Sequence, residues 1–179
     1  MSGHADASCS VKLPTVVTRT FGDDFRVRYN PPMDGNCQFH AVIDQLHMWN
    51  LDSNVSHDEL RSNVVAQLCD NLNTSDGSQS LQSFVTTDFS KYLLTMSKNG
   101  ESGDNITLKA VCELYNTQIV VISLNPDFSP QLVSSSNQYD PDKLCLILGH
   151  FEESKGEHYV SLELSASSVV NMPSTNTWV

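Results

Sequence analysis

The sequence has few basic residues, little glycine or proline, and no long apolar stretch. It carries 10 Lys and Arg against 21 Asp and Glu, for a net charge of -11 over 179 residues. This balance argues against a nucleic-acid-binding protein, because phosphate contacts need clustered cations. No window approaches the roughly 18 apolar residues of a membrane span, and residues 1–10 lack the apolar core of a signal peptide. Eight Gly and seven Pro are too few for a low-complexity chain.

Cysteine is present, but not in a pattern typical of disulfides. The five cysteines are odd in number and widely spaced, and no CxxC pair occurs: Cys9, Cys37, Cys69, Cys112 and Cys145. A small secreted domain usually has an even and denser set. We therefore expect an intracellular protein of the cytoplasm, with the nucleus as a second compartment. We interpret Cys69, Cys112 and Cys145 as core thiols on apolar faces, and Cys9 as part of a tail.

The sequence predicts one domain over residues 15–165, between flexible polar tails at 1–14 and 166–179. Helical patterns come first and apolar strand-like runs come later, which favours an α+β fold or a three-layer α/β sandwich. Within the helical half, Ser56 and Glu59 have the spacing of a capping box, and Asn105 is placed to cap a later helix. We predict helices at 37–49, 57–72, 81–97 and 105–114, with strands at 25–29, 118–124, 131–134, 143–149 and 157–164.

The turn Asp34-Gly35-Asn36 places Cys37 on the first turn of an amphipathic helix. The unpaired N–H groups and the positive dipole end at a helix start favour a thiolate. The same N–H groups are suited to hold the oxyanion of a tetrahedral intermediate, and Gly35 allows the backbone a close approach to a substrate. An ordinary buried thiol at a helix start explains this pattern equally well.

A cysteine nucleophile needs a histidine base, and the sequence offers six histidines. His158 opens a strand, and a strand-borne His facing a helix-borne Cys is the arrangement of papain-like hydrolases. His40 is close to Cys37 but is tied to the same helix. Taken alone, a histidine in the position of His158 is more often structural. Cys37-x-x-His40 is the one spacing that resembles a metal ligand pair, and no second pair matches it, so we expect no zinc site.

Together these motifs resemble the ovarian tumour (OTU) family of cysteine deubiquitinases. The D-G-N-C turn is followed by Phe39 and Ala41, and a late H-Y-x-S strand begins at His158. Between them, the segments 103–110 and 115–122 are similar to the middle helix and following strand of the family. The resemblance covers roughly residues 25–165. It implies a papain-like OTU fold, with a small central β-sheet sandwiched between helices.

The resemblance also implies roles for individual residues. Cys37 would be the nucleophile and His158 the general base, with Asp34 counted in the catalytic set. Gly35 and Asn36 would shape the oxyanion site, and His40 would flank the substrate channel.

The chain departs from the family at three positions. Val160 stands where relatives often carry the Asp or Asn that orients the histidine. We expect Asp34, or a backbone carbonyl near it, to replace that group, with Asp23 or Asp24 as weaker alternatives. Two smaller departures are His40, where many relatives carry Arg or Tyr, and Ser102, where Trp is common.

The implied activity is a thiol isopeptidase, acting as a monomer on ubiquitin or a ubiquitin-like modifier and its conjugates. It would need no metal or organic cofactor. Two alternatives stay open: a self-processing cysteine protease of viral or mobile-element origin, and a catalytically inactive ubiquitin-binding module, which is compatible with the Val160 departure. The surplus of acidic residues would either steer the basic tail of ubiquitin or serve only as a solubilising surface.

Overall fold

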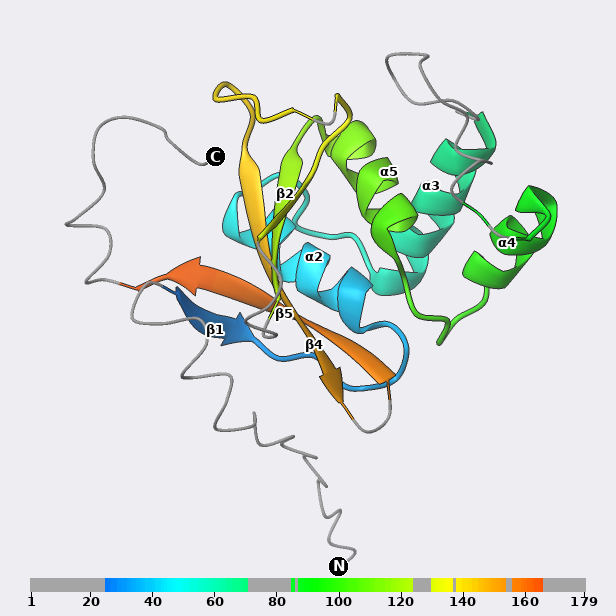
Figure 1. The fold of residues 1–179 in the computed structure, drawn as a ribbon, viewed down its shortest axis with the longest axis horizontal. Helices are drawn as coiled ribbons and strands as arrows, with labels where there is room; N and C mark the ends of the chain where they lie inside the picture. Colours follow the sequence, from blue (N-terminus) through cyan, green and yellow to red (C-terminus); the bar gives the residue numbers. More distant parts are fainter. Residues whose placement is uncertain are drawn as a thin grey trace, which may run out of the picture.

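The structure, a computed structural model, describes residues 25–70, 85, 87–123, 130–136, 138–153 and 156–165. The predictions for the two tails, for Cys9, Asp23 and Asp24, and for residues 71–84 lie outside these ranges. Figure 1 shows the elements in chain order, which are β1 (Phe25–Tyr29), α2 (Cys37–Met48), α3 (His57–Asp70), α4 (Phe89–Met96), α5 (Asn105–Tyr115), β2 (Gln118–Ser123), β3 (Gln131–Val133), β4 (Cys145–Glu153) and β5 (Gly156–Leu164).

The strands form one mixed sheet in the order β1-β5-β4-β2-β3. Strands β2 and β4 are parallel, and the other neighbouring pairs are antiparallel. The α+β class predicted from the sequence is therefore confirmed, including the short edge strand near Gln131. Strand β1 pairs with β5, with Val27 opposite Leu162 and Tyr29 opposite Ser161. This pairing carries the end of β1 toward the first residues of β5.

The described helices form a layer against the sheet (Figure 1). Helices α2 and α5 contact the strands, α3 packs against both of them, and α4 packs against α3. The main core joins these helices to buried strand residues such as Leu146 and Leu148. A second, smaller cluster of Phe151, Val160 and Leu162 is built from strand residues only. Within the described ranges, no helix is both long and apolar enough to cross a membrane.

Three of the described helices start at a side-chain cap: Ser56 for α3, Asp88 for α4 and Asp104 for α5. Ser56 Oγ accepts from the Glu59 N–H at 3.2 Å, as the capping-box pattern predicts. Helix α5 is capped by Asp104 and not by Asn105: Asp104 Oδ1 accepts from the N–H groups of Ile106 and Thr107, while Thr107 Oγ1 accepts from the Asp104 N–H. The reciprocal cap fixes the end of the loop that joins α4 to α5.

The thiols differ from one another in burial. Cys112 is buried and Cys145 is partly buried, consistent with core positions. Cys69 is exposed, so its assignment as a core thiol was wrong. It lies one residue before the end of α3, where the apolar stripe of the helix has turned away from it. Cys37 is buried, with 4% of its surface exposed.

Candidate active site

Cys37 is the first residue of α2, and a tight turn delivers it there. Gly35 has φ +79, a conformation that glycine adopts without strain. Asp34 Oδ1 accepts from the Asn36 N–H at 2.9 Å, which closes the turn. The helix then begins with the His40 N–H donating to Asn36 O at 3.0 Å. The D-G-N-C sequence therefore builds a turn that ends at the nucleophile candidate.

The fold brings Cys37 beside the strand that carries His158. Cys37 Sγ lies 4.0 Å from Glu157 O, a contact between residues 120 apart in the sequence. The Tyr159 N–H also interacts with the thiol. Glu157 and Tyr159 are the two neighbours of His158, which is fully buried on β5. The thiol of Cys37, the predicted nucleophile, thus lies beside the backbone on either side of His158, the predicted base.

Burial has the largest effect on the Cys37 thiol, and it raises the pKa above the ordinary value of 9.0. The N–H groups of Tyr159, Gln38 and Cys37 itself oppose this shift, and the charge of Asp34 adds to it. The N–H groups at the helix start therefore favour the thiolate, as expected. The desolvation of the thiol has a larger effect, however, and the net result is a raised pKa. The resting group is a neutral thiol that needs a base.

We predict that wild-type protein carries no Cys37 thiolate at neutral pH. Because the pKa of this thiol is raised, the thiolate forms only as the pH rises beyond the ordinary value of 9.0. The measurement is the ultraviolet thiolate absorbance as a function of pH, taken as the difference between wild type and Cys37→Ala. A Cys37 thiolate already present below neutral pH would contradict this prediction.

The partner of His158 Nε2 is Asn30, whose Oδ1 lies 2.8 Å away. Asn30 follows the last residue of β1, and the pairing of β1 with β5 brings it alongside His158. Asp34, which the sequence favoured for this contact, instead accepts from the Asn36 N–H. Val160 is fully buried in the smaller apolar cluster. An amide directly after the neighbouring strand thus supplies the contact that Val160 cannot make.

Asn30 fixes the tautomer of the neutral imidazole. An amide oxygen can only accept a hydrogen bond, so His158 Nε2 carries the proton and Nδ1 carries the lone pair. Asn30 was not among the groups predicted to orient His158, which were Asp34, a nearby backbone carbonyl, Asp23 and Asp24. The sequence feature that points to Asn30 is an amide residue at the end of a predicted strand, directly before Pro31-Pro32.

The backbone N–H groups of the turn differ in whether another group already accepts their hydrogen bond. The Asn36 N–H is engaged by Asp34, and within the described residues no backbone oxygen accepts from the N–H groups of Gly35 and Cys37. These two N–H groups are the donors that the turn can offer to an oxyanion. The Asn36 side chain points away from this role, since it bonds to Asn99 and Gly100.

His40 is half-buried, and its ring packs against His57 of α3 with the centroids 4.6 Å apart. Burial, followed by the neighbouring His57, lowers the pKa of His40. A place for His40 beside the substrate channel stays a prediction.

Solved structures share this arrangement of elements. The fold is similar to the crystal structure of an OTU deubiquitinase from Wolbachia pipientis wMel bound to ubiquitin, with a TM-score of 0.56 and 18% sequence identity. The match covers 80% of this chain and 98% of that chain. It shows that the fold is that of OTU domains, as the sequence resemblance implied.

The sequence comparisons identify the family. The chain is 40% identical to OVARIAN TUMOR DOMAIN-containing deubiquitinating enzyme 10 of Arabidopsis thaliana, over 51% of this chain and 23% of that protein. It is 31% identical to enzyme 12 of the same series, over 82% of this chain and 60% of that protein. The chain therefore spans less than two thirds of the length of these relatives. The family model described as OTU-like cysteine protease matches residues 32–159. The chain belongs to the OTU-like cysteine protease family.

Proposed function

We propose that this chain is a thiol isopeptidase that releases ubiquitin or a ubiquitin-like modifier from its conjugates. The observation that carries the proposal is the arrangement of Cys37, His158 and Asn30, with the thiol beside the His158 strand and Asn30 Oδ1 at 2.8 Å from His158 Nε2. A Cys-His-Asn set is the papain-like form of the catalytic triad. The relatives are named deubiquitinating enzymes, and the similar Wolbachia structure contains ubiquitin.

The first chemical step forms a thioester. His158 Nδ1 takes the proton from Cys37 Sγ, and the sulfur attacks the carbonyl carbon of the C-terminal Gly of the modifier. The carbonyl oxygen becomes an oxyanion, which the N–H groups of Gly35 and Cys37 stabilise. As the intermediate collapses, the C–N bond breaks and His158 returns the proton to the leaving lysine amine. Asn30 holds the imidazolium through Nε2 during the transfer.

The second step releases the modifier. His158 takes a proton from a water molecule, whose oxygen attacks the thioester carbon in the same oxyanion site. The C–S bond then breaks, the proton returns to Cys37 Sγ, and the modifier leaves with a free carboxyl group, which releases its proton to solvent. Both steps use the same residues, and no metal or organic cofactor takes part. We propose that the domain acts as a monomer in a reducing compartment.

The test is hydrolysis of an isopeptide-linked ubiquitin dimer, followed by gel electrophoresis. We expect the wild type to release monomeric ubiquitin and Cys37→Ala to release none. Cys69→Ala is the matched control, because this thiol is exposed and distant in sequence from the site; it should cleave like the wild type. If the wild type leaves the dimers intact but still binds ubiquitin, the inactive-module alternative is favoured instead. If the wild type neither cleaves the dimers nor binds ubiquitin, the self-processing protease is favoured.

Asn30→Ala should lower kcat about 10- to 100-fold, since a hydrogen bond to a charged group contributes roughly 1.5–3 kcal/mol. The imidazolium then loses the acceptor at Nε2 and the tautomer is no longer fixed. KM should change little, because Asn30 contacts the base and not the substrate. Steady-state kinetics on a ubiquitin C-terminal amide check this.

Asn30→Asp is the matched control, because it keeps an acceptor oxygen of similar size. We expect it to retain activity within about tenfold of the wild type. Wild-type kcat in Asn30→Ala would show that Asn30 has no part in orienting His158.

A further inference from the structure

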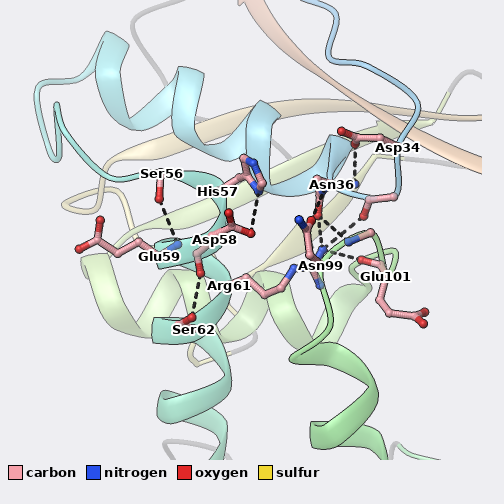
Figure 2. Close-up of polar contacts among 12 residues, drawn as sticks. Asp34, Asn36, Ser56, His57, Asp58, Glu59, Arg61, Ser62, Asn99 and Glu101 are labelled. Carbon is pink, nitrogen blue, oxygen red and sulfur yellow. Dashed lines mark hydrogen bonds and ion pairs between the residues drawn. The ribbon is translucent and has the colours of Figure 1, made fainter.

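A buried arginine lies behind the turn that presents Cys37. Arg61, on α3, has only 2% of its surface exposed. Its Nη1 donates to Met96 O at 2.9 Å, and its Nη2 donates to Asn36 Oδ1 and Glu101 O, each at 2.7 Å. Figure 2 shows the side chain reaching from α3 to the Asn36 turn and the loop of Asn99 and Glu101. One guanidinium therefore joins the turn, the end of α4 and the loop that follows it.

All these acceptors are neutral oxygens. Within the described residues, no carboxylate lies within ion-pairing distance of Arg61, and its guanidinium carbon sits 4.1 Å from the centre of the Phe39 ring. A buried cation without a bonded anion is unfavourable unless carbonyl groups and ring faces satisfy it. Arg61 is thus held by the turn and loop that it joins.

These contacts fix the peptide between Gly35 and Asn36. Gly35 O accepts from Arg61 Nη2 at 3.4 Å, and the Asn36 N–H at the other end donates to Asp34 Oδ1 at 2.9 Å. Asn36 Oδ1 also accepts from the Gly100 N–H at 3.1 Å. The N–H groups of Gly35 and Cys37 belong to the two peptides on either side. Their direction therefore depends on a peptide that Arg61 holds.

We infer that Arg61 is a positioning residue for the oxyanion site, a role that rests on the proposed function. Its guanidinium joins the Asp34–Asn36 turn to the Met96–Glu101 loop, so that the Gly35 and Cys37 N–H groups point at the developing oxyanion before substrate arrives. Lysine cannot replace it, because one ammonium does not present the planar fork that reaches Met96 O and the Asn36 side chain together.

The test compares Arg61→Lys and Arg61→Met with the wild type in two reactions of Cys37. Hydrolysis of a ubiquitin C-terminal amide passes through an oxyanion, whereas alkylation by iodoacetamide does not. We expect kcat for hydrolysis to fall roughly 10²–10³-fold, as when an oxyanion donor is lost. The alkylation rate should stay within about threefold, because it follows the thiolate. Arg26→Lys, at an exposed ion pair with Glu163, is the matched control and should match the wild type in both reactions.

Amide hydrogen exchange provides a readout that does not depend on activity. In the Arg61 variants, exchange in segments 34–37 and 97–101 should speed up roughly tenfold or more, while β4 and β5 keep wild-type protection. Both variants must first show cooperative thermal unfolding.

Several outcomes would overturn the inference. These are wild-type kcat in either variant, equal losses in hydrolysis and alkylation, and unchanged exchange in the two segments. If the wild type fails to hydrolyse any ubiquitin substrate, the proposed function fails, and the exchange measurement alone decides whether Arg61 holds the turn.

Discussion

Replacing His158 with alanine should lower kcat/KM for a ubiquitin C-terminal amide by roughly 10²–10⁴, the usual contribution of a general acid–base group. The size of the expected loss depends on the protonation of the Cys37 thiol as well as on the histidine. Burial raises the pKa of Cys37, so the sulfur is protonated at neutral pH and does not attack unaided. His158, whose ring is oriented by Asn30 at 2.8 Å, is the group proposed to remove that proton.

Two comparisons separate loss of the base from loss of the fold. His158 is fully buried against Phe151, so alanine leaves a cavity, and His158→Gln keeps more of the volume without a basic ring nitrogen. Both variants should lose activity while unfolding cooperatively. His150→Ala, which removes the histidine opposite Tyr159 on β4, should stay within about threefold of the wild type. Activity of His158→Gln above about a tenth of the wild-type value would exclude His158 as the base.

Gly35→Ala should lower kcat on the order of 10²–10³-fold, the usual effect of losing an oxyanion donor. The Cβ of alanine would lie 1.7 Å from Gly100 O, so the turn or the facing loop has to move. Either movement shifts the Gly35 N–H away from the oxyanion. Steady-state hydrolysis measures the loss, and alkylation of Cys37 should change much less because that reaction develops no oxyanion.

Gly100→Ala is the matched control. Gly100 has φ +85, close to the +79 of Gly35, so alanine introduces similar backbone strain at both positions. At Gly100, however, the nearest atom to the added Cβ is Asp34 O at 3.4 Å. We expect both variants to lose roughly 1 kcal/mol of stability from the positive φ, with a much larger loss of kcat in Gly35→Ala. Equal losses of kcat would show that strain, and not the close approach, explains the effect.

The local structure around Cys37 and His158, the proposed nucleophile and base, was predictable from the sequence, whereas their roles came from the family resemblance. The D-G-N-C turn defines its own geometry through Gly35 and the Asp34 cap, and the apolar alternation around His158 marks a strand. The Asn30 contact was not predictable in this way. It depends on the pairing of β1 with β5 and on the irregular register between Val27 and Tyr29, and a single sequence does not reveal which strands are neighbours.

The position of Arg61 in the apolar pattern of α3 was an indication of its burial that the sequence-based predictions did not include. Arg61 lies three, four and seven residues before Val64, Val65 and Leu68, and therefore falls on the apolar face of α3. A charged residue on such a face is either a break in the pattern or a buried group with partners.

The cap of α5 was misplaced by one residue, to Asn105. Asp104 and Asn105 are both good caps, and only the reciprocal contact with Thr107 distinguishes them.

The most direct test of the proposed chemistry is the intact mass of the protein after reaction with ubiquitin that carries a C-terminal electrophile. We expect one ubiquitin to be added to the wild type, peptide mapping to place it on Cys37, and Cys37→Ala to remain unlabelled. Asn30→Ala should label more slowly than the wild type, whereas Arg61→Lys should label within about threefold of it when the electrophile forms no oxyanion. Attachment at the exposed Cys69, or no attachment to a folded wild type that still binds ubiquitin, would contradict a mechanism in which Cys37 attacks the C-terminal carbonyl of the modifier.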